Sequence, residues 1–373
     1  MISFCKKCIM PSSRPRISFD KTGVCNACNN SEKKKLINWD ERKKKFLEII
    51  RNLKENKNRN KYYDCVVPWS GGKDSSSIAY KLKYEYDLNP LLVTFSPLLP
   101  NEIGEYNRKV ILDLGFDSIF VSPNTNISKK LARRFFLERG NPKVAWDAGI
   151  NSAPVKIALS YKIPLVFYAE HGESEYGGHV LSEESLFRRD LREVIEHQIG
   201  DYPENWSNDD IDLNSLAPYI YPDKGEFDEF KVEALYFSYF FKWSMFENFE
   251  YIKKNVKNFK KSPERTNGTF TDFDSLDDKI DNLYYHMQHI KFGFGRATRD
   301  ACRMIQNNQM TREDAIKNAK MYDNEFPENN LKEVLSFLNL SKNQLDEVIN
   351  KHRNNEIWQL KGNNWELVNK IYE

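Results

Sequence analysis

The sequence predicts an α/β protein built on a parallel, doubly wound sheet, with a small cysteine-rich lobe before the sheet and a mainly helical region after it. Three observations support this fold class. Short apolar segments alternate with helical patterns between about residues 61 and 200, which is typical of a parallel sheet covered on both faces. Four of the six cysteines fall within the first 28 residues. Helical patterns dominate after about residue 180.

These changes in character divide the 373 residues into four expected regions. Residues 1–35 form a metal-binding lobe, and residues 36–60 form a helix with a linker. Residues 61–200 form the sheet domain. Residues 201–373 form a mainly helical region that serves a substrate or a partner.

The composition supports a folded protein and gives no support for a nucleic-acid-binding, membrane-spanning or secreted protein. Hydrophobic residues make up 40% of the chain and charged residues 29%, which allows a packed core and a well-solvated surface. The formal net charge is only +2, so the composition does not favour a nucleic-acid-binding protein. No apolar run reaches the ~18 residues of a membrane-spanning helix, and the first residues lack the apolar centre of a secretion signal. We therefore expect a cytoplasmic protein with reduced thiols.

The first region contains two cysteine pairs and predicts a structural metal site. Cys5 and Cys8 form one C-x-x-C pair, and Cys25 and Cys28 form the other. Two such pairs supply four thiolates in a tetrahedron, which is the arrangement of a zinc ribbon. Zn²⁺ binding would also provide folding energy that so short a lobe lacks. An iron–sulfur cluster is the main alternative, and a pair of disulfides is the other.

The remaining elements are expected in a regular order. An amphipathic helix covers 38–57, and the polar stretch 52–61 serves as a linker. Apolar strands are expected at 63–69, 91–95, 118–121 and 165–169. Helices between and around them are expected at 74–86, 102–114, 127–139 and 151–161. The aromatic run at 235–243 is expected to pack in the core of the helical region.

The loop between the first strand and its helix carries the clearest sign of chemistry. It reads Ser70-Gly71-Gly72-Lys73-Asp74-Ser75, followed by Ser76. The start of a helix leaves backbone N–H groups unpaired, and these groups bind anions. The glycines let the backbone approach oxygen atoms closely, the hydroxyls add donors, and Lys73 adds positive charge. A carboxylate at Asp74 is unusual in an anion cradle and suggests a Mg²⁺ contact.

This loop resembles the S-G-G-x-D-S loop of the N-type ATP pyrophosphatases, the PP-loop superfamily with an adenine nucleotide α-hydrolase-like fold. The resemblance implies that residues 70–76 grip the pyrophosphate of ATP while a substrate oxygen attacks the α-phosphate. Lys73 and Asp74 are then expected to be catalytic. The end of the second strand is expected to hold the adenine, and it reads Thr94-Phe95-Ser96.

A second polar loop follows the strand that ends at residue 169. It reads Glu170-His171-Gly172-Glu173-Ser174-Glu175 and continues to Gly178. Loops at the carboxyl ends of parallel strands line the ligand crevice of such folds. We expect His171 and Glu173 to be catalytic, through phosphate binding, proton transfer or Mg²⁺. Glu175 is expected to hold Mg²⁺ or substrate, and a solvated, glycine-flexible loop is the alternative.

Several longer strings resemble, as a set, the bacterial N-acetyl sugar amidotransferases of pseudaminic acid, legionaminic acid and lipopolysaccharide sugar pathways. They are the two cysteine pairs, the loops at 69–75 and 170–178, and the segments 272–279 and 291–300. In the last segment, Arg296 and Arg299 are expected to hold an anionic group of the substrate, with a helix-start turn as the alternative. The aspartates at 272–278 are expected to cap a helix, with binding of substrate hydroxyls as the alternative.

This family resemblance implies an ATP-dependent, AMP-forming carbon–nitrogen ligase. The amide oxygen of a sugar N-acetyl group attacks the α-phosphate, pyrophosphate leaves, and ammonia displaces AMP to give an acetamidino group. The expected cofactors are ATP as a substrate, Mg²⁺ and Zn²⁺. The expected partners are an N-acetylated sugar or nucleotide sugar and a separate glutaminase subunit that supplies ammonia.

Two other functions compete with this interpretation. A tRNA thiolation enzyme of the same superfamily would need a basic face and reactive cysteines beyond the metal set. Cys65 and Cys302 are isolated, which is typical of buried thiols. A zinc-ribbon binding module with an inactive nucleotide fold is the third possibility, and the intact loop at 70–75 argues against it.

Overall fold

The centre of the protein is a five-stranded parallel sheet, as seen in a computed structural model that describes residues 2–56 and 60–372. The strand order is β3-β2-β1-β4-β5, so the order changes direction beside β1. The strands are β1 (Cys65–Pro68), β2 (Pro90–Phe95), β3 (Asp117–Val121), β4 (Leu165–Tyr168) and β5 (Glu233–Tyr236). The carboxyl ends of β1 and β4 flank this change of direction, where doubly wound sheets bind their ligands. The expectation of an α/β fold with a parallel sheet is confirmed.

Helices cover both faces of the sheet because successive strand residues point in opposite directions. In β1, Cys65 and Val67 pack on one face with α2, α3 and α11, whereas Val66 packs on the other face with α6. All three side chains are fully buried. The helices around the sheet are α2 (Trp39–Glu55), α3 (Lys73–Tyr84), α4 (Glu102–Leu112), α5 (Thr125–Arg139), α6 (Val144–Tyr161), α9 (Lys224–Phe230), α10 (Phe237–Phe240) and α11 (Met245–Asn255).

The expected elements differ from the structure in two informative places. The expectation of helical structure after residue 180 is wrong at residues 233–236, which form β5 and pair with β4. Among the described residues after 180, this short apolar segment is the one strand of the parallel sheet, and the aromatic residues after it turn into α10. The helix expected at 151–161 begins seven residues earlier, at Val144, and continues through Pro154. Part of the expected linker at 52–61 lies outside the described residues, and the part up to Glu55 belongs to α2.

Short helices and turns connect β4 to the C-terminal region. They are α7 (Gly172–Tyr176), α8 (Leu191–Val194), the π-helix η1 (Ile195–Ile199), and the 3₁₀ helices η2 (Pro203–Trp206) and η3 (Leu213–Tyr219).

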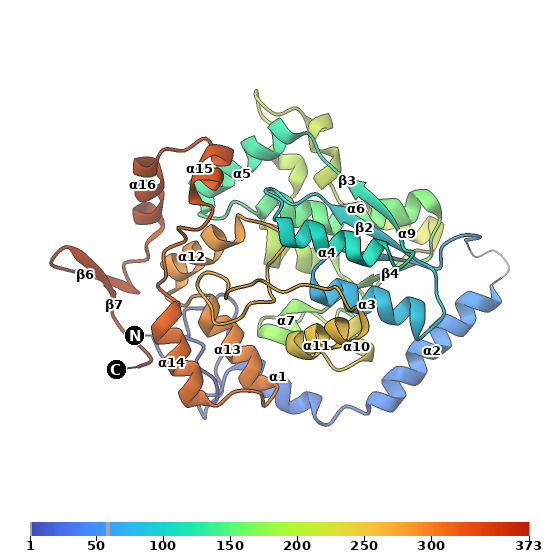
Figure 1. The fold of residues 1–373 in the computed structure, drawn as a ribbon, viewed down its shortest axis with the longest axis horizontal. Coiled ribbons are helices and arrows are strands. Elements are labelled where there is room, and N and C mark those ends of the chain that lie inside the picture. The colour runs from blue at the N-terminus through green and yellow to red at the C-terminus, as the bar shows by residue number, and fades with distance from the viewer. Residues whose placement is uncertain (1, 57–59, 373) are drawn as a thin grey trace.

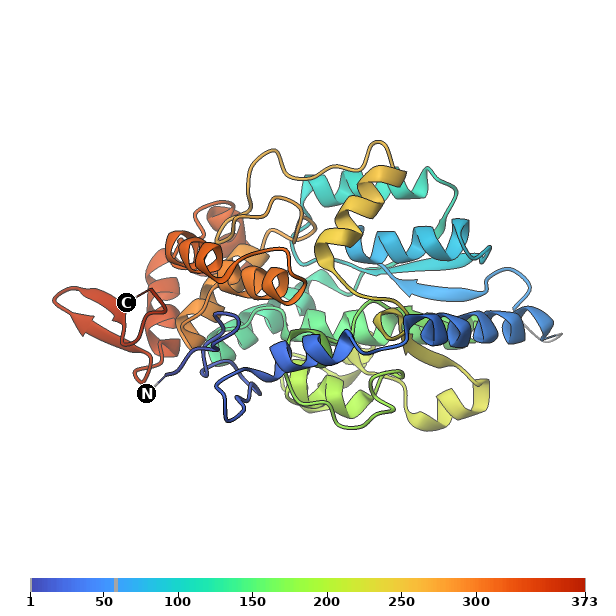
Figure 2. The same cartoon turned by 90° about the horizontal axis from the view of Figure 1, so that it is seen from below.

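The C-terminal region packs beside the end of the sheet and against the N-terminal lobe (Figures 1 and 2). The side chain of Ser31, in α1, donates a hydrogen bond to the carbonyl of Gln306, at the end of α13, at 2.6 Å. The elements here are α1 (Asn26–Lys34), α12 (Asp281–Phe292), α13 (Arg296–Gln306), α14 (Arg312–Tyr322), α15 (Leu331–Leu338), α16 (Lys342–His352), β6 (Trp358–Lys361) and β7 (Asn364–Leu367). Of the helices in the described part of the chain, none has the length and apolar character that crossing a membrane requires.

Candidate active site

The loop after β1 opens onto a cavity of about 490 Å³, which we call the loop cavity. Residues 70–75 line it together with the ends of β2 and β4, helix α6 and the segment 273–285. Gly72 is the residue before α3, and no side chain caps that helix start. Gly71 has φ +90°, and a Cβ there would clash with the side chain of Arg108. The turn therefore needs glycine and leaves the N–H groups of α3 directed at the cavity.

Lys73 is the buried cation of this loop, with 4% of its surface exposed. Its Nζ lies 2.8 Å from Asp74 Oδ2 and 2.5 Å from Asp274 Oδ1. Burial opposes the charge, but the carboxylates of Asp274 and Asp74 outweigh burial and raise the pKa of Lys73. Asn248 Nδ2 donates to the other oxygen of Asp74 at 2.9 Å. Lys73 is thus charged and held in place by two carboxylates.

Asp274 was not among the expected site residues, although the aspartate-rich segment 272–278 contains it. The positive charges of Lys73, Arg299 and Arg296 overcome burial and keep the pKa of Asp274 well below its usual range. The expectation that this segment caps a helix holds for one contact, because Asp278 Oδ1 accepts a hydrogen bond from the N–H of Ile280, the residue before α12, at 3.1 Å. Asp278 also accepts hydrogen bonds from the backbone N–H groups of Leu98 and Leu99, at 2.8 and 3.1 Å. The segment forms one wall of the loop cavity.

The other residues expected to bind nucleotide divide into those that face the cavity and those that support it. Ser70, Ser75 and Phe95 line the loop cavity. Ser76 is fully buried and accepts a hydrogen bond from Trp69 Nε1 at 2.9 Å. Thr94 is also buried, and its hydroxyl donates to the carbonyl of Trp69 at 2.6 Å.

Ser96 lies outside the loop cavity and lines a smaller neighbouring one. Its carbonyl accepts a hydrogen bond from Trp146 Nε1 at 3.1 Å. The strand end therefore presents Phe95 rather than the flanking hydroxyls to the cavity.

Most polar residues of the second loop point away from the loop cavity. His171 is 2% exposed and its Nε2 lies 2.6 Å from Glu193 Oε2. Glu173 forms a bidentate pair with Arg16, at 2.8 and 3.0 Å, and Glu175 pairs with Lys34. Both of these cations belong to the N-terminal lobe. The structure therefore places three expected site residues in supporting contacts and connects the second loop to the lobe.

Glu170 is the residue of the second loop that lines the loop cavity. Tyr176 donates to its Oε1 at 2.9 Å. Burial, and secondly the charge of Asp74, raise the pKa of Glu170 to about 7. The motif contained Glu170, but sequence alone gave no reason to prefer it over Glu173 or Glu175.

Asp147, in α6, is a second carboxyl with a raised pKa. Burial raises it to about 7, against the opposing charge of Lys143. No motif in the sequence pointed to this residue, which reaches the cavity at the start of α6, where Lys143 pairs with Asp281 of α12. Glu170 and Asp147, which both line the loop cavity, therefore have pKa values near neutral pH.

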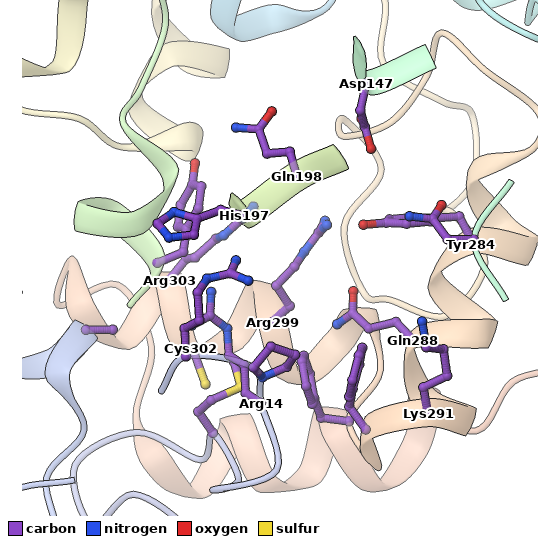
Figure 3. Close-up of a pocket in the computed structure, with 18 of the residues that line it drawn as sticks. Arg14, Asp147, His197, Gln198, Tyr284, Gln288, Lys291, Arg299, Cys302 and Arg303 are labelled. Carbon is purple, nitrogen blue, oxygen red and sulfur yellow. The ribbon is translucent and has the colours of Figure 1, made fainter. Parts of the chain in front are cut away.

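A second cavity of about 470 Å³, the lobe cavity, lies between the N-terminal lobe, α12 and α13 (Figure 3). Asp147, Gln198 and Tyr284 line both cavities, so the two are neighbours. Arg299 lines the lobe cavity and pairs with Asp274 and Asp300, both at 3.2 Å. Arg296 is 1% exposed, lines neither cavity, and donates to the carbonyl of Asp274 at 2.7 Å. Of the two arginines expected to bind substrate, Arg299 lines one of these two cavities and Arg296 lines neither.

The four cysteines of the lobe converge in a buried cluster. Cys5, Cys8, Cys25 and Cys28 are fully buried, and their Sγ atoms all lie within 4.8 Å of one another. The Sγ–Sγ distances of 4.0 Å for Cys5–Cys28 and 3.7 Å for Cys8–Cys25 match the ~3.8 Å edge of a tetrahedron with metal–sulfur bonds of ~2.3 Å. Backbone N–H groups of Cys8, Cys25 and Cys28 point at these sulfurs. The residues thus fit a tetrahedral zinc ion.

One comparison with known proteins finds a similarity in the C-terminal region. A family described as "LPS biosynthesis protein WbpG-like, C-terminal domain" matches residues 267–372. A search of curated proteins finds no match. One similar solved structure is described as a predicted subunit of a tRNA methyltransferase from Methanocaldococcus jannaschii, and it is 20% identical with a TM-score of 0.22. That alignment covers 37% of this chain and 70% of the other, and at this TM-score it supports no conclusion.

The matched region includes Asp274, Tyr284 and Arg299, and so it contributes to both cavities. The C-terminal part of this chain is therefore similar to the C-terminal domain of WbpG-like lipopolysaccharide biosynthesis proteins.

Proposed function

We propose that this protein is an ATP-dependent amidotransferase that converts a sugar N-acetyl group into an acetamidino group in the biosynthesis of a surface polysaccharide or a nonulosonic acid. One observation carries the proposal: Asp274, inside the region similar to a lipopolysaccharide biosynthesis domain, contacts Lys73 of the PP-loop-like turn. A nucleotide-type loop and a sugar-biosynthesis-type region thus line one cavity.

The proposed reaction has two steps. The amide oxygen of the acceptor forms a bond to the α-phosphorus of ATP, and the bond to pyrophosphate breaks, which leaves an O-adenylated imidate. Ammonia then adds to the imidate carbon, and AMP leaves with the former amide oxygen. The product is an amidine, and the net change is replacement of one oxygen atom by an NH group.

Different residues of the loop cavity would bind phosphate, hold Mg²⁺ and accept a proton. The N–H groups at the start of α3 and the charge of Lys73 would hold the leaving pyrophosphate. Asp74 and Glu170 would hold Mg²⁺, which neutralises phosphate charge when bound, because both are carboxylates of the same cavity. Asp147 lines both cavities and would accept a proton from the attacking ammonia, since its pKa near 7 suits that role.

Ammonia is proposed to come from a separate glutaminase subunit. Cys65 is fully buried within β1, which does not suit a glutaminase nucleophile. Cys302, in α13, is 2% exposed and lines the lobe cavity, but it stands in no recognisable nucleophile motif. We place the reaction in the cytoplasm, where ATP is available and thiols stay reduced.

The test is to incubate the full-length protein with ATP, Mg²⁺, ammonium and a panel of N-acetyl sugars. We expect AMP as the nucleotide product and a sugar mass lower by the difference between O and NH. Release of ADP, or AMP without any change in sugar mass across the panel, would contradict the proposal. Omission of ammonium separates the two steps, because adenylation should then stall before the mass change.

A further inference from the structure

Positively charged side chains outnumber acidic side chains in the lining of the lobe cavity. Five lysine and arginine side chains line it, against one carboxyl, Asp147. The five cations are Arg14, Arg16, Lys291, Arg299 and Arg303. Because the pKa of Asp147 lies near 7, even this carboxyl is only partly charged at neutral pH.

Two of the five cations are neutralised by carboxylates. Arg16 pairs with Glu173, and Arg299 pairs with Asp274 and Asp300. Arg14, Lys291 and Arg303 form no ion pair with any carboxylate among residues 2–56 and 60–372. Lys291 donates only to the carbonyl of Arg139 within that range, at 2.7 Å.

Several buried polar atoms of these residues also lack hydrogen-bond partners. They are Nη1 of Arg14, Nε of Arg303, and both ring nitrogens of His197, which lie 3.7 Å from Glu173 Oε2 and 3.5 Å from Glu196 Oε1 without forming a hydrogen bond. The His197 side chain is only 1% exposed, yet it lines the cavity. Burial, together with the neighbouring charges of Arg16 and Arg303, lowers the pKa of Arg14 to about 10 despite the opposing effect of Glu173. Buried, unpaired donors and charges are costly, and a bound anion would remove that cost.

We propose that the lobe cavity binds an anionic group, a phosphate or a carboxylate, of the acceptor molecule. Arg14 and Arg303 bind the anion, Lys291 adds charge, and His197 donates a hydrogen bond. Figure 3 shows Arg14, Arg299 and Arg303 close together, with Lys291 on the far side of the same cavity. This inference rests on the proposed function and names the binding site of its second substrate.

The position of the lobe cavity beside the loop cavity defines how the bound acceptor is oriented. Its anionic group lies in the lobe cavity, and its acetamido group extends past Asp147 and Tyr284 into the loop cavity. Arg14 stands between the two cysteine pairs, on the segment that connects Cys8 to Cys25. The metal lobe is then a substrate-binding element as well as a structural one.

The experiment measures the binding of small anions to the full-length, metal-loaded protein by calorimetry. The loop cavity is first saturated with α,β-methylene-ATP, so that phosphate probes cannot occupy it. The probes are UDP, glucuronate and neutral N-acetylglucosamine. Tighter binding of UDP identifies a diphosphate group, tighter binding of glucuronate identifies a carboxylate, and either result supports the site.

Arg14→Gln and Arg303→Gln should each weaken the binding of the anion by roughly 10–100-fold, since each removes a charged donor. Lys21→Gln is the matched control, because it removes one exposed positive charge from the same lobe and should leave binding unchanged. Metal content shows whether Arg14→Gln leaves the lobe intact, and Arg303→Gln tests the same site from α13. Equal binding by the wild type and Arg303→Gln, or loss of the anion site when the ATP analogue is present, would overturn the inference.

Failure of the anion-binding experiment can be distinguished from failure of the proposed function. Amidine formation on neutral acceptors, with no anion binding by the wild type, would leave the reaction standing and remove this site. Binding of anions without AMP formation on any N-acetyl sugar would keep the site and remove the reaction.

Discussion

The loops after β1 and β4 occupy equivalent places in the fold and have different surroundings. Both follow parallel strands beside the change in strand order, and both carry charged residues with glycines. Residues 70–75 face the loop cavity, whereas Glu173 and Glu175 of the second loop are paired with cations of the N-terminal lobe. A strand end therefore marks where chemistry can occur, and packing of distant segments decides which side chains take part.

The largest expected effect is at the first loop. Lys73→Ala should lower AMP formation by roughly 10²–10³-fold, because it removes the buried charge that would hold the leaving pyrophosphate. AMP release with ammonium and an accepted N-acetyl sugar measures the loss, and zinc content should stay at the wild-type level. Turnover within a few-fold of wild type would contradict the difference between the two loops. The first loop would then be no more important for activity than Glu173 and Glu175, which pair with cations of the N-terminal lobe.

The contact between the second loop and the lobe is tested through the metal ligands. Cys25→Ser should lower metal affinity by at least roughly 100-fold, because a hydroxyl replaces one of four thiolates. Without the metal, the lobe loses folding energy and the positions of Arg16 and Lys34. Hydrogen exchange should then speed up in residues 171–178 more than in 70–76. Lys21→Ala is the control in the same lobe. Equal acceleration of hydrogen exchange in residues 171–178 and 70–76 would show that the lobe does not specifically hold the second loop.

Glu170 belongs to the second loop but lines the loop cavity, so we expect its substitution to affect activity as substitutions in the first loop do. Its pKa of about 7 lies above the usual range, so it is protonated below that pH and ionised above it. If the ionised form is active, kcat/KM should rise with pH through about 7, and Glu170→Gln should flatten this rise and lower activity roughly tenfold. Asp147→Asn shows how much of the remaining pH dependence belongs to Asp147. An unchanged profile in both variants would exclude these carboxyls as its source.

The smallest effect is expected at Glu173. Glu173→Gln should change AMP formation by less than about threefold and lower the free energy of unfolding by about 1 kcal/mol, because the Arg16 pair is partly exposed. Burial opposes ionisation, but Arg16 and His197 lower the pKa of Glu173 below its usual value. The stabilisation is therefore present above the unfolded-state pKa and is lost as the pH falls through the folded value. Denaturation at pH 7 and pH 4 should show the smaller difference at pH 4.

Local sequence patterns determined much of this protein. The alternation of apolar strands and helices, the glycine turn before Lys73 and the spacing of the four cysteines each depend on near neighbours, whose geometry is fixed by short-range sterics and hydrogen bonding. From these local features the parallel sheet, the loop cavity and the cysteine cluster could be predicted. β5 was missed because its four residues carry no pattern that distinguishes a buried strand from the start of an aromatic helix.

Only the tertiary structure decided which charges meet. Asp274 reaches Lys73 across 201 positions of the chain, Arg16 reaches Glu173 across 157, and Asp147 lines two cavities together with Tyr284 of α12. Coulomb interactions and desolvation depend on distance and burial rather than on order along the chain. The roles of Glu170, Glu173 and Glu175, adjacent and chemically alike in sequence, were therefore separated only by what folded against them.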